Sequence, residues 1–171
     1  GEESGAIFVV FGRDTAIEGN FPAVFELSAL DGSNGFVLNG AHAHDHAGRS
    51  VRGAGDINHD GVADLLIGAN GADANGENSG ASYLVFGRTA ATEGDFPASL
   101  ELASLNGRNG FVLNGVSTGD ASGISVSGVG DVNGDGRMDL VSVSNTAVFY
   151  IRNFGFGIYG NGQVINEVSN N

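Results

Sequence analysis

Apolar residues in this chain occur in short runs, and glycine, asparagine and aspartate interrupt these runs throughout. No window of the sequence keeps the 3.6-residue period of an amphipathic helix. Short apolar runs separated by turn residues are typical of β-strands joined by tight turns. The clearest runs predict strands at residues 50–55, 65–68, 81–86 and 110–113. The pattern therefore predicts an all-β fold in which helix is a minor component.

Comparison of the chain with itself reveals a repeat that returns after 75 residues. The segment Gly-Phe-Val-Leu-Asn-Gly at residues 35–40 is identical at residues 110–115, and about two-thirds of the first forty residues match. One repeat holds the four predicted strands, which is the pattern of a four-stranded propeller blade. Between the third and fourth strands lies an insertion with Leu100, Leu102 and Leu105, for which we expect an irregular flap over the blade edge.

An acidic loop separates the first and second strands of each repeat. Oxygen-bearing side chains stand at relative positions 1, 3, 5 and 9, and glycine stands at position 6. Ca²⁺ takes six to eight oxygen ligands, and glycine permits the tight turn that wraps a short loop around the ion. The predicted ligands are Asp56, Asn58, Asp60, Asp64 and the Val62 carbonyl in the first loop, and Asp131, Asn133, Asp135, Asp139 and the Arg137 carbonyl in the second.

Two other structures, a polar β-turn and an EF-hand, also use loops rich in Asp, Asn and Gly. Polar β-turns also favour Asp, Asn and Gly, but two copies with identical spacing favour a cation site. Three Asp side chains within ~5 Å repel one another by several kcal/mol unless a cation lies among them. An EF-hand requires Glu at position 12 and flanking helices, whereas position 12 is Ile67 or Ser142 and the flanks predict strands. The loops therefore predict two structural Ca²⁺ sites between β-strands.

The order of these motifs resembles the FG-GAP repeats of integrin α-subunit propellers and of many bacterial secreted proteins. The similarity consists of the acidic loop with Leu65 after it, then Ile67-Gly68-Ala69-Asn70 where the family often has Gly-Ala-Pro, and finally Phe86-Gly87. It covers residues 1 to about 144. The resemblance implies a Ca²⁺-braced β-propeller, commonly of seven blades, that serves adhesion or ligand binding. Seven blades of this length would need about three times this chain.

The positions of the predicted strands within the 75-residue repeat divide the chain into three units. Residues 1–40 form a half blade with strands three and four, and residues 41–115 form a complete blade with a calcium loop. Residues 116–171 form a half blade with the second calcium loop and a divergent β-rich tail from residue 145 onward. About two blades leave open strand edges. We expect them to be completed by other subunits added head to tail, in a ring or a filament, or by a longer chain.

Charge and composition narrow the classes of partner. The net charge of −13 argues against nucleic acid and anionic membranes. No apolar stretch approaches the ~20 residues of a membrane span, so we expect no membrane insertion. Nucleophile-elbow, zinc-protease and phosphate-loop motifs are missing, as is cysteine, and we expect no enzyme. Simple calcium loops suit the calcium-rich extracellular space, and a chain that starts Gly-Glu-Glu looks processed or excised.

Three histidines alternate around Asp45, and an extended backbone would place their imidazoles on one side. Zn²⁺ or Cu²⁺ binds such an arrangement. The second repeat has Ser117, Gly119 and Ala121 at these positions, which favours a surface loop that gains charge below about pH 6.5. The histidines are His42, His44 and His46.

The sequence thus predicts a calcium-stabilised extracellular structural or adhesive protein that self-assembles head to tail, as a homo-oligomer or filament. The alternative is a carbohydrate- or protein-binding propeller module of a larger secreted protein, with glycans or cell-surface and matrix proteins as partners. Tyr150 and Tyr159, in the tail, fit either a sugar site or a subunit contact, and we favour the contact.

Overall fold

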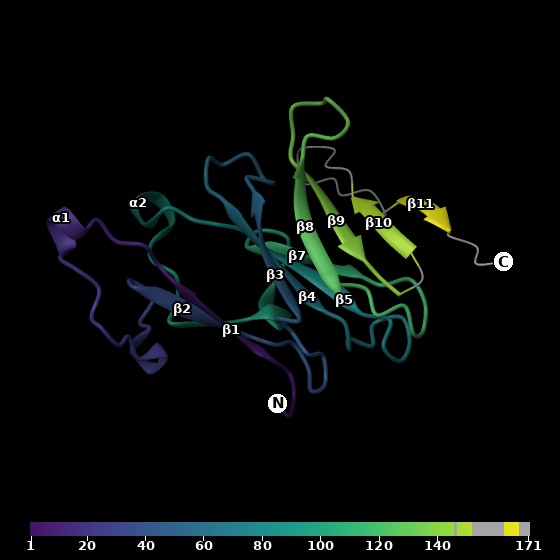
Figure 1. Cartoon of the computed structure of the whole chain (residues 1–171), viewed down its shortest axis with the longest axis horizontal. Coiled ribbons are helices and arrows are strands. Elements are labelled where there is room, and N and C mark those ends of the chain that lie inside the picture. The colour runs from purple at the N-terminus through teal and green to yellow at the C-terminus, as the bar shows by residue number, and fades with distance from the viewer. Residues whose placement is uncertain (146, 152–162, 168–171) are drawn as a thin grey trace.

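A computed structural model describes residues 1–145, 147–151 and 163–167 of the chain. In this part the strands form three sheets, and the first, seen in Figure 1 beside the N-terminus, has the order β1-β2-β6. Its first two strands are antiparallel, and the third is added in parallel from a distant part of the sequence. The strands are β1 (Ala6–Val10), β2 (Gly35–Asn39) and β6 (Ser99–Glu101).

The second sheet is an antiparallel meander in which the order of strands is β3-β4-β5-β7. All four strands predicted for the complete blade are confirmed, each to within one residue at either end. The all-β prediction is confirmed as well, because helices in the described residues are short. The strands are β3 (Ser50–Gly55), β4 (Asp64–Ala69), β5 (Ala81–Val85) and β7 (Gly110–Asn114).

The third sheet has four strands in the order β11-β10-β9-β8, where the repeat alone predicts two. The divergent tail, for which the sequence predicts a β-rich segment, supplies β10 and β11. β10 lies on β9 in the register that β5 keeps on β4, since Leu140 faces Ile151 as Leu65 faces Val85. The strands are β8 (Ser125–Gly130), β9 (Asp139–Val143), β10 (Ala147–Ile151) and β11 (Gln163–Glu167). Tyr159 lies outside the described residues.

Two insertions separate the third strand of a unit from its fourth: the first insertion (residues 11–34) and the second insertion (residues 86–109). Each contains one turn of α-helix and one of 3₁₀-helix. The second insertion is not the irregular flap that the sequence suggests, because it contributes β6 to the first sheet and buries Leu100 and Leu102 there. The helices are α1 (Thr15–Glu18), α2 (Ala90–Glu93) and 3₁₀ turns at Leu27–Ala29 and Leu102–Ser104.

The two inner strands of the middle sheet, β4 and β5, are buried on both faces, and their alternating side chains form two separate cores. On β4, Ile67 faces the first sheet and Leu66 faces the third. The core toward the first sheet includes Ile7, Phe36, Leu38, Ile67, Tyr83, Val85, Leu100 and Leu102. The core toward the third sheet includes Ala54, Ile57, Leu66, Leu84, Phe86, Val126 and Leu140.

The second and third units approach closely where Gly68 of β4 meets the carbonyl of Gly123. A Cβ at residue 68 would lie 1.9 Å from that oxygen and 2.5 Å from Ser50 Oγ. Buried hydroxyl groups form hydrogen bonds beside this contact, since Ser142 Oγ lies 2.9 Å from Ser82 Oγ and 3.1 Å from Ser122 Oγ. Only glycine fits at residue 68 without separating the two units.

Gly68→Ala is therefore expected to destabilise the fold by about 3 kcal/mol, the upper range for overpacking in a dense core. The change should appear as a lower urea midpoint with an unchanged m-value. Gly12→Ala is the matched control, because nothing lies within 4 Å of a Cβ at residue 12. Equal midpoints for the two variants would contradict the expectation.

Candidate metal loops

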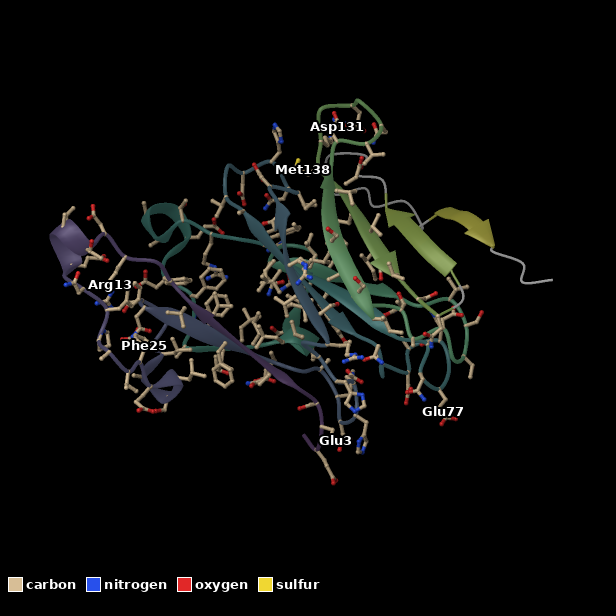
Figure 2. The ribbon with its side chains drawn as sticks, in the orientation of Figure 1. Glu3, Arg13, Phe25, Glu77, Asp131 and Met138 are labelled. Atoms are coloured by element: carbon tan, nitrogen blue, oxygen red, sulfur yellow. The ribbon has the colours of Figure 1, made fainter. Side chains whose placement is uncertain are left out.

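The two acidic loops connect β3 to β4 and β8 to β9, and both project from the same end of the molecule, at the top of Figure 1. Figure 2 labels Asp131 and Met138 in the second loop. The loops are neighbours, because the Met138 side chain packs so close to Gly55, just before the first loop, that a Cβ there would lie 2.7 Å from it. The 75-residue repeat thus places both predicted ligand sets side by side.

Both loops fold around the aspartate at position 1. In the first loop, the Asp56 carboxylate accepts hydrogen bonds from the backbone N–H groups of Asp60 (3.0 Å) and Gly61 (2.8 Å). The aspartate at position 5 then accepts one from position 7, since Val62 N lies 2.8 Å from Asp60 Oδ1. The Asn58 amide donates to Asp60 at 2.6 Å. Four predicted ligand residues are therefore brought together in one compact turn.

The second loop repeats the backbone hydrogen bonds of this pattern, but its asparagine differs, since the Asn133 amide donates to Asp139 at position 9. Asp131 accepts from Asp135 N (3.1 Å) and Gly136 N (2.7 Å), and Asp135 accepts from Arg137 N (3.0 Å). Another difference is the Arg137 guanidinium, which lies 3.6 Å from Asp135 Oδ2 and offsets part of that charge. The shared hydrogen bonds show that the spacing of the motif, rather than the variable residues within it, sets the loop conformation.

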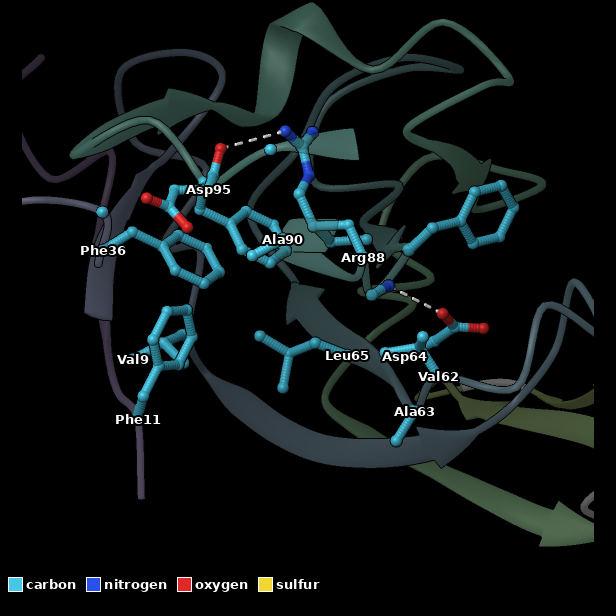
Figure 3. Close-up of a pocket in the computed structure, with 16 residues that line it drawn as sticks. Val9, Phe11, Phe36, Val62, Ala63, Asp64, Leu65, Arg88, Ala90 and Asp95 are labelled. Atoms are coloured by element: carbon cyan, nitrogen blue, oxygen red, sulfur yellow. Dashed lines mark hydrogen bonds between the residues drawn. The ribbon is translucent and has the colours of Figure 1, made fainter. Parts of the chain in front are cut away.

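The aspartate at position 9 is buried in both loops, in contrast to the aspartates at positions 1 and 5 of the first loop. Asp64 accepts from Ile57 N at 2.7 Å and, as Figure 3 shows, from Gly87 N at 2.8 Å. Asp139 accepts from Val132 N at 3.0 Å. Each buried carboxylate therefore ties its loop to the following strand, and Asp64 also ties it to the end of β5.

Burial raises the pKa of the Asp64 carboxyl above its ordinary value, because a charged carboxylate is poorly solvated there. The hydrogen bonds from Gly87 and Ile57 act in the opposite direction, and the nearby charges of Asp60 and Asp56 raise the pKa further. A cation near these three carboxylates would favour the charged form. The electrostatics of the first loop are thus those of a site that gains by binding positive charge.

One atom in the second loop tests whether the residues fit a calcium ion. Asn133 Oδ1 is buried and has no hydrogen-bond partner, although its amide nitrogen donates to both oxygens of Asp139. A buried acceptor without a partner is costly, and a hard cation binds amide oxygen. Three His, Cys, Asp or Glu side chains do not converge as a metal site among the residues described. A calcium ion would therefore have to bind Asn side-chain oxygens and backbone carbonyl oxygens together with the carboxylates.

The three histidines do not share a site. His44 and His46 have left-handed backbone conformations and lie in a loop, as the favoured interpretation of the sequence predicts, and not on the extended backbone that the metal-site alternative requires. Their imidazoles each lie 3.4 Å from Glu3 Oε2, while His42 lies 3.4 Å from Asp45. Hydrogen bonding from His44 and His46 lowers the pKa of Glu3.

A pocket of about 400 Å³ beside the first loop was missed in the sequence analysis (Figure 3). Phe36 and Phe96 stack in its wall with ring centroids 4.1 Å apart, and Phe11 packs against both. The Arg88 guanidinium lies 4.6 Å from the centroid of Phe96, and Asp64 forms part of the lining. The recurring Phe-Gly-Arg and Phe-Pro pairs of the two insertions were the available signal.

Antiparallel sheets arranged in a repeat, with an acidic loop between the first two strands of a unit, define a blade-type β repeat protein. The model of the FG-GAP repeat matches residues 47–85, so the chain carries an FG-GAP repeat across β3, the first loop, β4 and β5. Such a repeat suggests a β-propeller module of the integrin type. No curated protein matches the chain. None of the helices among the described residues has the length and apolar character needed to cross a membrane.

Proposed function

We propose that this chain is a calcium-stabilised structural or adhesive module that acts outside the cell and assembles with copies of itself. The observation that carries the proposal is the hydrogen-bond pattern shared by the two acidic loops, which brings the oxygen-bearing side chains of the motif together at the same place in each unit. FG-GAP repeats typically occur in extracellular or secreted proteins. The proposed role is not enzymatic.

Each loop would hold one ion with its own residues. When bound, Ca²⁺ supplies positive charge that offsets the clustered carboxylates. Asp56 and Asp131 orient the loops through their hydrogen bonds to positions 5 and 6. Asp64 and Asp139 anchor the loops to the following strands. The proposed ligands are those of the sequence analysis: Asp56, Asn58, Asp60, Val62 and Asp64, and Asp131, Asn133, Asp135, Arg137 and Asp139.

Calorimetric titration of the chelator-treated protein with Ca²⁺ should give two sites per chain. Asp56→Asn should remove the first site and Asp131→Asn the second, because each change puts a neutral amide in place of the carboxylate around which the loop folds. Glu77→Gln serves as the control, since this exposed carboxylate lies outside both loops. Binding heat that is absent, or a stoichiometry unaffected by both Asn variants, would contradict the calcium proposal.

A second candidate function is favoured by the aromatic pocket beside the first loop. Aromatic faces, an arginine and an aspartate are typical components of a site for a carbohydrate or a protein side chain. Under this alternative the chain is a binding module for glycans or for cell-surface and matrix proteins. A glycan array with Phe96→Ala as the negative variant tests it: selective, saturable signals that the variant loses would favour this function over self-assembly.

A further inference from the structure

The strands β2 and β7 have the same sequence, Gly-Phe-Val-Leu-Asn, yet they differ in burial. Phe36 and Leu38 are buried in β2, whereas Phe111 and Leu113 are half-buried in β7, and Val112 is exposed. β2 is covered because β6 pairs with its edge and Phe96 stacks on Phe36. β7 ends its sheet, and in the described part of the chain only β5 is paired with it among the named strands. β7 is therefore an acceptor edge identical in sequence to one that binds an insertion.

The first insertion exposes apolar side chains at positions where the second insertion buries them. Leu102 of the second insertion is 1% exposed because it packs under β2, whereas Leu27 at the same repeat position is 45% exposed. Phe21 and Val24 are exposed as well. Arg13 lies 4.6 Å from the Phe21 centroid, as Arg88 lies from Phe96, so both insertions hold the same local contact. The first insertion thus keeps the arginine–phenylalanine contact of the docked second insertion, while its Phe21, Val24 and Leu27 stay exposed in the described part of the chain.

The placement of the first insertion prevents it from reaching β7 of its own chain in the same way. It lies at the far left of Figure 1, where α1 marks it, while β10 and β11 lie at the opposite end of the molecule. Figure 2 labels Arg13 and Phe25 in this outlying region. The second insertion reaches back to the unit before it. By the same geometry, the first insertion would dock on the fourth strand of a unit that adjoins the first sheet.

The third sheet offers a second position at which a strand like β1 could pair. In the register shared with β5, the tail strand β10 reads Ala-Val-Phe-Tyr-Ile, and β1 reads Ala-Ile-Phe-Val-Val at the equivalent positions. β1 pairs with β2 and, among the described strands, has no partner on its other edge. β10 therefore occupies, next to β9, the place that the repeat assigns to a strand with the sequence pattern of β1.

We propose that β1, the first insertion and β2 of one copy complete the third sheet of a second copy, replacing that copy's β10 and β11. The first insertion then docks on β7 of the second copy as the second insertion docks on β2. Residues 24–26 pair in parallel with residues 112–114, in the register that joins residues 99–101 to 37–39. The inference specifies the contact and the regulation of the proposed self-assembly, and it rests on that proposal.

This contact is heterologous, because each copy uses one surface as donor and a different one as acceptor. Such contacts close into rings or extend into filaments. The tail acts as a competitor that caps the third sheet until a second copy displaces it. Each copy carries a net charge of −13, so association between copies should strengthen with added salt.

Disulfide trapping tests the register directly, since the chain contains no cysteine. Residue 24 of one copy is predicted to lie opposite residue 112 of the other, as Ser99 lies opposite Val37. Both valines are exposed, at 72% and 42%, so cysteine is tolerated at either site. Val24→Cys and Val112→Cys chains are mixed in Ca²⁺ under mild oxidation. In the control mixture, Val116→Cys replaces Val112→Cys; this loop valine is 57% exposed, between the values of the other two.

The Val24→Cys and Val112→Cys mixture should give about tenfold more disulfide-linked dimer than the control, because docking raises the local thiol concentration. Adding Phe149→Pro to the Val112→Cys chain should raise the yield, since proline weakens the pairing of β10 with β9 and frees the acceptor. Adding Leu27→Asp to the Val24→Cys chain should lower it.

Light scattering of the unmodified chain distinguishes self-assembly itself from the particular contact proposed between copies. If the chain associates but the two mixtures give equal yields, the contact is overturned while self-assembly stands. If Phe149→Pro lowers the yield, the tail does not compete and that part is overturned. If the calcium-saturated chain stays monomeric at high concentration, self-assembly and the contact are both overturned, whereas the calorimetric titration still decides the calcium sites.

Discussion

Asp64→Ala is expected to lower the free energy of unfolding by about 4 kcal/mol, measured in millimolar Ca²⁺. The Asp64 carboxylate is buried and accepts hydrogen bonds from Ile57 N at 2.7 Å and Gly87 N at 2.8 Å. Its removal leaves buried N–H groups without an acceptor, each at a cost of about 1–3 kcal/mol. It also removes a proposed calcium ligand, so the first loop loses its anchor to β4 and to the end of β5.

Urea denaturation measures this loss, and Asp60→Ala is the matched comparison. Asp60 is a proposed ligand of the same ion, but its side chain is exposed. The difference between the two variants therefore isolates the buried hydrogen bonds from the loss of a ligand. A loss for Asp60→Ala as large as that for Asp64→Ala would show that the anchoring role of Asp64 is wrong.

Removal of calcium is the second large effect. A ligand that binds only the folded state stabilises it by RT ln(1 + [L]/Kd), about 1.4 kcal/mol per site when its concentration is tenfold above Kd. Two sites give about 3 kcal/mol, which for a chain of this size corresponds to a Tm lower by roughly 6 to 12 °C in EGTA. Differential scanning fluorimetry with and without chelator measures the shift.

The pH dependence of that shift follows from the raised pKa of Asp64. In the chelated chain the folded state holds this proton more tightly than the unfolded state, so the contribution of Asp64 to stability falls as pH rises through the window between the ordinary and the raised pKa. Ca²⁺ favours the charged form instead. The Tm difference should therefore be largest above this window and shrink below it. Full recovery with equimolar Mg²⁺, or a Tm insensitive to EGTA, would argue against structural calcium sites.

The complete blade was predictable because local signals and the repeat agreed there. Alternating apolar residues and turn-forming Gly, Asn and Asp fixed the bounds of β3, β4, β5 and β7 to within a residue. The spacing of the acidic motif also placed the loops correctly between strands. The hydrogen bonds from positions 5 and 6 to position 1 then follow from a short turn that must satisfy its own backbone N–H groups.

Features that depend on distant contacts were not predictable. β6 has only three residues and pairs with β2 across about sixty positions of sequence, so no local pattern reveals it. β10 and β11 occupy strand positions of the repeat, but their sequences depart from it, so the repeat does not reveal their pairing. The role of Gly87 in binding Asp64 was hidden as well, since the two residues are 23 positions apart.

The pairing of β6 with β2 also constrains the order in which the chain folds. Domains emerge from the ribosome N-terminus first, and contacts that close long loops form slowly. The first sheet needs Leu100 and Leu102 to cover Phe36 and Leu38, so it stays incomplete until most of the second unit has been synthesised. We therefore expect the N-terminal unit, although it is translated first, to complete its fold only after most of the middle unit is available.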